Sequence, residues 1–169
     1  TIAGSGPNGA IVHYRANKKT NRRIKDDDLF LVDSGAQYFD GTTDVTRTIA
    51  FKKVTLEQKK MYTMVLKGHI AVATSSFKEN EDGKQLDKKA RKFLLKENLN
   101  FDHGTGHGVG SFLNVHESPP SISPLSKYNF KKGMIVSNEP GYYEKNNFGI
   151  RIENLIYVKK IKKKNYFEN

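Results

Sequence analysis

Residues 101–117 read FDHGTGHGVGSFLNVHE, and they hold three of the chain's five histidines among four glycines. The three histidines are His103, His107 and His116. Glycine lets a backbone bend and approach its neighbours closely where a side chain would obstruct it. Imidazole is the commonest metal ligand among side chains and exchanges protons near neutral pH. We therefore expect this segment to carry a functional site.

The composition is that of a compact domain without cysteine. At 169 residues the chain fits one domain, and ten phenylalanines and eight tyrosines supply bulky core material. The lack of cysteine in the sequence excludes disulfides, cysteine-ligated zinc and thiol nucleophiles, and it favours a cytoplasmic protein. No apolar run approaches the ~18 residues of a membrane span, so we expect no membrane association.

The formal net charge of +11 raises nucleic acid as a partner. The positive residues concentrate in NKKTNRRIK, residues 17–25, and in KKIKKK, residues 159–164. Neither run interleaves aromatic side chains with its lysines, as proteins that stack single-stranded bases do. We interpret both runs as solvated surface, and nucleic acid is not an expected partner.

The pattern of apolar residues predicts strands towards both ends of the chain and two helices between them. Thr55 and Gln58 have capping-box spacing, so one helix is predicted from Thr55, and a second from about residue 84 to residue 97. A proline-rich loop is predicted over 117–124. This order favours an α+β fold with a largely antiparallel sheet. The strand-like runs are 28–39, 44–51, 134–140 and 148–158.

One apparent motif is a false lead. Residues 4–9, GSGPNG, match the dinucleotide-binding pattern G-x-G-x-x-G. They are followed by AIVHY, residues 10–14, which is strand-like, and the motif contains Pro7. Without a helix to present its N-terminus to a pyrophosphate the fingerprint has no mechanism, so we reject a dinucleotide site.

Four carboxylates lie in apolar, strand-like surroundings, namely Asp33, Asp44, Glu139 and Glu153. A carboxylate is costly to bury unless it is paired or holds a metal. Asp33 alone would fit a strand-end turn equally well, and Glu153 could form a buried ion pair with Arg151. Taken together with a histidine in a glycine-rich loop, the four favour a metal site.

The hairpin between the first two strands poses a geometric problem for that hypothesis. A two-residue turn at Asp40–Gly41 would pair Phe39 with Thr42 and leave Asp33 and Asp44 four residues apart on one face. At strand rise this is ~13 Å, too far for one shared ion. The metal hypothesis therefore predicts that this turn assignment is wrong and that the loop is wider or bulged.

Two aspartates, two glutamates and one histidine form an oxygen-rich ligand set. Such a set suits Mn, Fe, Co or Zn, with Mn favoured by the carboxylates. Four negative charges would balance two divalent ions, which bridging carboxylates would hold ~3.5–4 Å apart. Spacing in the sequence does not show that these five residues converge.

Five motifs that follow one another along the chain resemble those of aminopeptidase P of the cytosolic eukaryotic type. This is the X-prolyl aminopeptidase branch of the pita-bread metallopeptidases. The likeness extends from GPNGAIVHY to ENLIYV. It implies a pita-bread (creatinase/aminopeptidase) fold, with a curved, largely antiparallel sheet backed by helices. The motifs are DSGAQY (33–38), GTTDVTRT (41–48), HGTGHGVGSFLNVHE (103–117), SNEPGYY (137–143) and GIRIEN (149–154).

Carried onto this sequence, the resemblance implies two divalent metal ions, most often Mn²⁺, with Zn²⁺, Co²⁺ or Fe²⁺ as alternatives. Asp44 and Glu153 would bridge the two ions. Asp33 would bind one ion, and His107 and Glu139 would bind the other. Glu139 would also shuttle a proton from the bridging water as a general base.

The resemblance also implies roles around the metal ions. His13, His103 and His116 match positions that line the substrate pocket. They would bind the substrate and stabilise the tetrahedral intermediate, with His103 and His116 acting in catalysis. Arg151 and Tyr143 match positions that support the ligands from behind.

The activity implied is release of the N-terminal residue from peptides with proline in the second position. A metal-bridging hydroxide would attack the scissile carbonyl. The alternatives are a prolidase that cleaves X-Pro dipeptides and a non-catalytic pita-bread binding module, although such a module would be expected to lose ligands that are all present here. His69 is expected to be an ordinary helix residue.

The resemblance also implies that the chain is part of something larger. Residues 1–169 are expected to form a metallopeptidase catalytic domain that is incomplete at both ends and lacks the N-terminal domains of the family. The full-length parent is expected to be a homodimer.

Overall fold

The computed structural model describes residues 1–78, 81–110 and 114–160. Part of the histidine-rich run and most of the basic run at 159–164 lie outside these ranges. The described part contains two α-helices, α1 (Leu56–Ala73) and α2 (Gly83–Leu95), and a short 3₁₀ helix, η1 (Gly6–Ala10). Neither α-helix combines the length and hydropathy that crossing a bilayer requires. The strands are β1 (Ile2–Ser5), β2 (Leu29–Asp33), β3 (Ala36–Tyr38), β4 (Gly41–Thr43), β5 (Thr46–Ala50), β6 (Gly106–Gly108), β7 (Glu117–Ile122), β8 (Ile135–Asn138), β9 (Gly141–Glu144), β10 (Phe148–Arg151) and β11 (Asn154–Tyr157).

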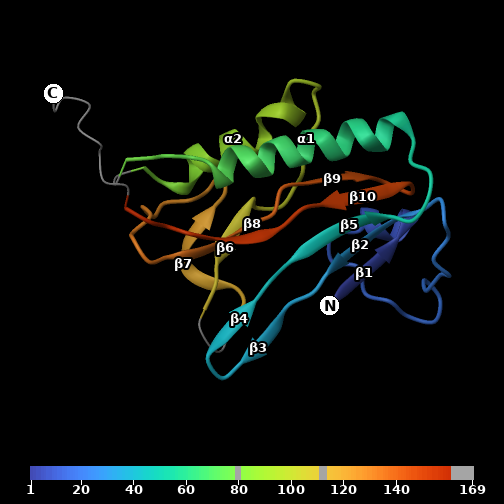
Figure 1. Cartoon of the computed structure of the whole chain (residues 1–169), viewed down its shortest axis with the longest axis horizontal. Coiled ribbons are helices and arrows are strands. Elements are labelled where there is room, and N and C mark those ends of the chain that lie inside the picture. Colours follow the sequence, from blue (N-terminus) through green and yellow to red (C-terminus); the bar gives the residue numbers. More distant parts are fainter. Residues whose placement is uncertain (79–80, 111–113, 161–169) are drawn as a thin grey trace, which may run out of the picture.

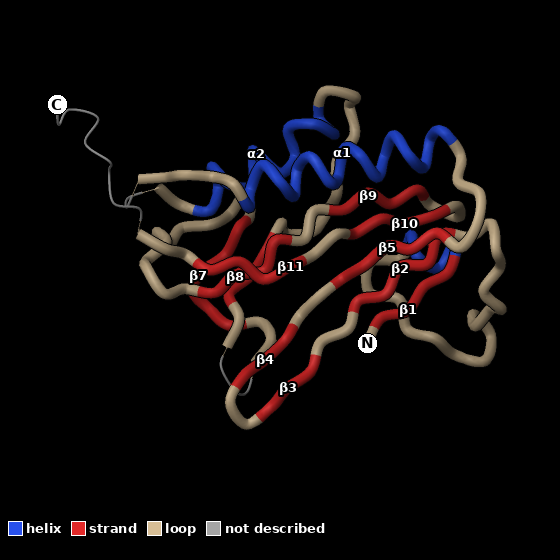
Figure 2. The backbone as a smooth tube through the Cα atoms, viewed as in Figure 1, coloured by secondary structure: helices blue, strands red, loops and turns tan. Residues whose placement is uncertain are grey.

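The described strands pair in antiparallel ladders along one side of the two helices (Figure 1). β1, β2 and β5 form one sheet, and β11, β8, β6 and β7 form another. β9 pairs with β10, and β3 pairs with β4 in a hairpin that extends away from the helices (Figure 2). The predicted α+β class with a largely antiparallel sheet is confirmed.

The two helices begin where local sequence directs them to begin. The Thr55 hydroxyl accepts from the Gln58 backbone N–H at 3.1 Å, and the Gln58 side chain accepts from the Thr55 N–H at 2.9 Å. This confirms the predicted capping box, which satisfies two N–H groups that the helix leaves free. The Asp82 carboxylate caps α2 by accepting from the Lys84 N–H at 3.0 Å.

The core lies between the helices and the strands, in two clusters. The first packs α1 and the end of α2 against β2, β9 and β10, and includes Val65, Leu94 and Ile150, each 0% exposed. The second packs the far ends of both helices against β7 and β8, and includes Ile122 and Val136, also 0% exposed. Helices on one face leave the opposite face of the strands free to carry polar groups.

The turn assignment at Asp40–Gly41 is wrong. Tyr38 pairs with Gly41, so the two-residue loop is Phe39–Asp40. The same register continues into β2 and β5, where Asp33 pairs with Thr46. The loop is shifted rather than wider, and the shift reduces the offset between Asp33 and Asp44 from four residues to two. Diagonal neighbours at this offset are ~7–8 Å apart, within reach of a shared site.

Two local predictions from composition are also wrong. Residues 10–14 form no strand, because the chain turns out of η1 at Ala10 and continues as a loop. The proline-rich run at 117–122 is strand β7 rather than a loop. β7 pairs only with β6 among the described strands, and proline is tolerated at such a sheet edge because an N–H there needs no partner.

Gly149 in β10 lies directly against the backbone of η1. A Cβ built there would overlap the carbonyl oxygen of Gly9. We expect Gly149→Ala to lower the free energy of unfolding by about 3 kcal/mol, since backbone atoms must move to admit the methyl group. Gly41→Ala is the matched control, because nothing lies within 4 Å of its Cβ position. Urea denaturation measures both, and equal losses of stability would contradict the close approach.

Candidate metal centre

The predicted ligands converge on one cavity from distant parts of the sequence. All five line a cavity of about 880 Å³. Asp33 ends β2 and Asp44 lies between β4 and β5. His107 lies in β6, Glu139 follows β8, and Glu153 lies between β10 and β11.

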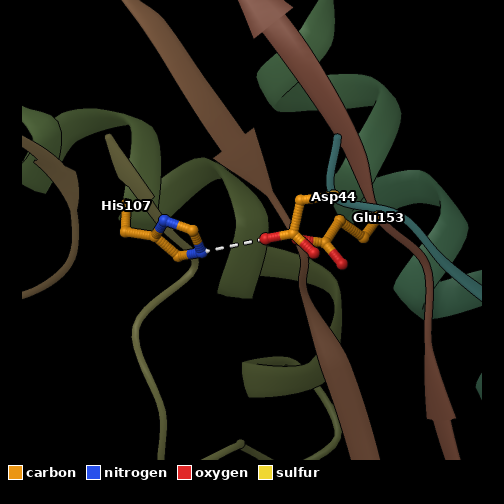
Figure 3. A group of neighbouring side chains, drawn as sticks. All are labelled: Asp44, His107 and Glu153. Atoms are coloured by element: carbon orange, nitrogen blue, oxygen red, sulfur yellow. Dashed lines mark ion pairs between the residues drawn. The ribbon is translucent and has the colours of Figure 1, made fainter. Parts of the chain in front are cut away.

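Asp44, His107 and Glu153 form the tightest group. Each offers one ligand atom, and these atoms all lie within 4.8 Å of one another. The two carboxylates lie side by side and His107 faces them from the other side (Figure 3). His107 Nε2 is 3.5 Å from Asp44 Oδ2, while Nδ1–H donates to the Gly108 carbonyl at 2.9 Å. That bond leaves Nε2 to bind an ion, the usual arrangement for a ligating histidine.

Glu139 extends the group on the side of His107. Its Oε1 lies 3.3 Å from His107 Nε2 and accepts from the Ser137 hydroxyl at 2.9 Å. The same hydroxyl accepts from the His107 backbone N–H at 2.9 Å. The Glu139 N–H donates to the Thr105 carbonyl at 2.8 Å. These bonds connect Glu139 to the histidine-rich segment on both its side chain and its backbone.

Glu153 is the most buried ligand candidate, at 1% exposure. Its Oε2 accepts from the buried Thr46 hydroxyl at 2.6 Å, and its N–H donates to the Thr46 carbonyl at 3.2 Å. Thr46 lies two residues after Asp44, so the segment that carries one bridging candidate also supports the other.

Asp33 is held by Arg151 at the edge of the group. Arg151 Nη2 donates to Asp33 Oδ2 at 2.8 Å, and Nη1 donates to the Tyr143 hydroxyl at 2.9 Å. The open alternative, a buried pair between Arg151 and Glu153, is therefore wrong for the described structure, because the guanidinium pairs with Asp33 instead. The Tyr143 hydroxyl lies 2.8 Å from His103 Nε2.

The three histidines predicted to bind the substrate line the same cavity, but they differ in exposure and in hydrogen bonding. His116 is exposed, and its ring packs edge-on against the His107 ring with centroids 4.2 Å apart. His13 is exposed as well. Both ring nitrogens of His103 have partners, because Nδ1 also bonds the Gly104 carbonyl at 2.8 Å. His103 therefore contacts the cavity with its hydrogen bonds already satisfied by the protein.

The carboxylates and His107 perturb one another strongly. Burial raises the pKa of Glu153 to about 8, and the nearby charges of Glu139, Asp44 and Asp33 act in the same direction. Burial lowers the pKa of His107, but the Asp44 and Glu139 carboxylates outweigh it and raise that pKa to about 10. Without metal, a protonated His107 therefore serves as the counter-ion of the group.

This arrangement fits divalent cations. The His107 imidazolium and the Arg151 guanidinium together supply two positive charges, which do not balance four ionised carboxylates, and buried charge without a partner is costly. Hard oxygen donors with a single nitrogen suit Mn, Fe, Co or Zn rather than thiolate-preferring metals. The donor set therefore fits the two ions that the sequence led us to expect.

The raised pKa of His107 sets an expected pH dependence for metal binding. Binding must displace the proton on Nε2, and that proton is retained up to about pH 10 in the metal-free chain. We expect Mn²⁺ affinity to rise at least about tenfold for each pH unit between pH 6 and pH 8, since one proton leaves per ion bound at His107. Calorimetric titration in buffers across this range measures it. A flat profile would contradict a protonated His107.

A buried network missed by the sequence analysis holds the loop that leads to His107. Asp87 and Arg91 in α2 pair at 2.8 Å, with the residues 2% and 7% exposed. Arg91 donates to the carbonyls of Phe101 and His103 at 2.6 and 2.7 Å. Asp87 accepts from the Thr105 hydroxyl at 2.7 Å. Their spacing of four residues on a helix was the only available signal.

Asp87→Ala is expected to lower the free energy of unfolding by about 3–5 kcal/mol, because it leaves the Arg91 charge buried without its partner. Lys60→Ala is the control, since it breaks the exposed pair of Lys60 with Glu97 and should cost about 1 kcal/mol or less. Urea denaturation compares the two. Losses of similar size would show that the network contributes little.

The chain is similar to known proteins in both sequence and structure. Residues 1–160 match Metallopeptidase family M24. The chain belongs to this family. A probable Xaa-Pro aminopeptidase P from Paracoccidioides brasiliensis is 52% identical over 165 residues, which are 96% of this chain and 27% of that protein. The resemblance to aminopeptidase P is confirmed.

Solved structures support the M24 fold. The X-prolyl aminopeptidase of Caenorhabditis elegans, described as a cytosolic enzyme with a di-nuclear active site, superposes with a TM-score of 0.86 at 42% identity, over 92% of this chain and 26% of that one. Prolidase from Pyrococcus furiosus superposes with a TM-score of 0.84 at 33% identity, over 94% and 45%. The pita-bread fold is confirmed. This M24 chain spans about a quarter of the length of the curated relatives.

Proposed function

We propose that this chain is the metal-binding part of an Xaa-Pro aminopeptidase, which releases the N-terminal residue from peptides with proline in the second position. The observation that carries the proposal is the convergence of Asp33, Asp44, His107, Glu139 and Glu153 on one cavity. The naming of the relatives as Xaa-Pro aminopeptidases supports the substrate class.

We propose these five residues as the ligands of two divalent ions, with Mn²⁺ preferred because four of the donors are carboxylates. Asp44 and Glu153 would bridge, since their carboxylates lie side by side and both face His107. When bound, the two ions would lower the pKa of a water molecule and polarise the scissile carbonyl.

We propose that Glu139 moves the proton in this reaction. Within the described residues, both contacts of its carboxylate fall on Oε1, from His107 and Ser137, so Oε2 is available to accept a proton. A carboxylate at hydrogen-bond reach of the reacting water can act as general base and then return the proton to the leaving amine.

The histidines around the cavity would hold the peptide. His13 and His116 are exposed there and can donate to carbonyl groups of the substrate, including the one on which charge develops. The catalytic and substrate-binding role of His103 stays a prediction, and its two ring contacts would also keep Tyr143 and the pocket wall in place. Arg151 supports the site by orienting Asp33 and Tyr143 together.

Substrate length separates the two candidate activities. An aminopeptidase should release the first residue from an X-Pro-Y tripeptide, whereas a prolidase should cleave an X-Pro dipeptide; the similarity to a prolidase keeps that second function open. The assay compares both peptides with an X-Ala-Y control in the presence of Mn²⁺. Cleavage of the dipeptide alone would favour the prolidase, and equal cleavage of X-Ala-Y would contradict proline specificity.

Two further properties stay proposals. We propose a cytoplasmic location, supported by the description of the Caenorhabditis elegans relative as cytosolic. The homodimer predicted for the full-length parent also stays a prediction, which light scattering of that longer protein would check.

A further inference from the structure

His69 in α1 contacts both strands that lead to the two glutamates. It is 7% exposed and lies on the face of the helix that covers β8 and β11. The residues that line the cavity do not include His69. A buried histidine with two strand partners differs from the ordinary helix residue expected from sequence.

The ladder between β8 and β11 ends where the proposed ligands begin. Its last pair is Asn138 with Asn154, and the next residues in the same register are Glu139 and Glu153. Beyond that pair the two strands separate, because the Glu139 N–H donates to the Thr105 carbonyl and the Glu153 N–H to the Thr46 carbonyl. The spacing between Asn138 and Asn154 therefore sets the spacing from which the backbones of Glu139 and Glu153 separate.

His69 holds this last pair from behind. Its Nδ1 lies 3.0 Å from the Asn138 carbonyl oxygen, so Nδ1–H donates there. Its Nε2 accepts from the Asn154 side-chain amide at 3.2 Å. The Asn138 side chain returns a bond to the His69 carbonyl at 2.9 Å. One ring thereby bonds both strands, and the neutral form serves both contacts.

Side chains alternate between the two faces of a strand, and this alternation connects the His69 contacts to the metal site. Successive side chains of a strand point to opposite faces. Asn138 points to α1, as its bond to His69 shows, and Glu139 therefore points to the cavity that it lines. Burial lowers the pKa of His69 and outweighs the backbone contacts to Asn138 and Ile152, which act in the opposite direction, so the neutral ring is favoured.

We propose that His69 is a positioning residue that fixes the relative placement of Glu139 and Glu153 and so tunes the affinity for the second of the two metal ions. The inference rests on the proposed function, since it assumes that these glutamates bind metal. Partners one step removed from the ligands typically change metal affinity about 10–100-fold.

The test uses the 169-residue chain and Mn²⁺ alone. His69→Phe keeps a ring of similar size and removes both hydrogen bonds, whereas His69→Asn keeps a donor for the Asn138 carbonyl. Val65→Ala is the matched control, because Val65 is buried one turn earlier on α1 and packs in the first core cluster. Calorimetric titration gives the two Mn²⁺ affinities, and urea denaturation of the metal-free chains gives stability.

His69→Phe is expected to weaken binding of the second ion about 10–100-fold relative to Val65→Ala, with His69→Asn recovering part of the loss. Affinities within about threefold of Val65→Ala for both variants would overturn the positioning role. If His69→Phe does not fold, the Mn²⁺ affinities of His69→Asn are compared with those of Val65→Ala instead, with the same threshold. A parent chain that binds no Mn²⁺ would refute the proposed function, and the inference with it, whereas a parent that binds two ions isolates the question of His69.

Discussion

Glu139→Gln is expected to lower kcat for residue release from an X-Pro-Y peptide about 10²–10⁴-fold, the range that a positioned general base contributes. The amide keeps the size of the side chain and can still accept from the Ser137 hydroxyl, so the local structure should persist. What it loses is the ability to take a proton and one ligand charge. Steady-state kinetics with saturating Mn²⁺ measures the change.

The control for Glu139 is Glu57→Gln, which removes a carboxylate from an exposed position in the first turn of α1 outside the cavity. Its kcat should match that of the parent chain. A Glu139→Gln variant with kcat within about threefold of the parent would remove Glu139 from proton transfer, since even a modest general base contributes about 100-fold.

Glu153→Gln should weaken Mn²⁺ binding by more than about 100-fold, because even residues that only support ligands change affinity 10–100-fold. Peptide release should fall below detection with it. The fold should survive, since the Thr46 hydroxyl can still donate to the amide oxygen. Burial also raises the pKa of Glu153, so a neutral side chain is well tolerated there. Calorimetry and urea denaturation together separate loss of metal from loss of structure.

Glu144→Gln provides the comparison for Glu153, because Glu144 lies in β9 and outside the lining of the cavity. It should bind Mn²⁺ like the parent chain. Unchanged Mn²⁺ affinity in Glu153→Gln would exclude Glu153 as a bridging ligand. Loss of folding in that variant would contradict the claim that Thr46 and the amide can replace the native bond.

Local chemistry predicted the helices well and the turn and one strand poorly. The capping box at Thr55 and Gln58 acts within one helical turn, so the sequence contains all of its partners. The register of β3 and β4 depends instead on the β2–β5 ladder that continues it, so a favourable Asp40–Gly41 pair did not decide the turn. β7 pairs with β6 despite its prolines, which no composition rule reveals.

The candidate site was likewise predictable from sequence only in part. The apolar settings of Asp33, Asp44, Glu139 and Glu153 marked them from sequence as costly carboxylates. Their assignment to one centre came from the resemblance. The roles of His69 and Arg91 were not predictable, because these side chains act on residues 69 and 10 positions away in the chain. Such contacts exist only once the helices pack on the strands.

The most direct test of the account is a calorimetric titration of the metal-free chain with Mn²⁺ at pH 8, paired with the same titration of Glu153→Gln. Two ions are expected to bind per parent chain, and Glu153→Gln is expected to lose binding of at least one. A parent chain that binds no Mn²⁺, or binds a single ion unaffected by Glu153→Gln, would contradict a two-metal centre built from these five residues.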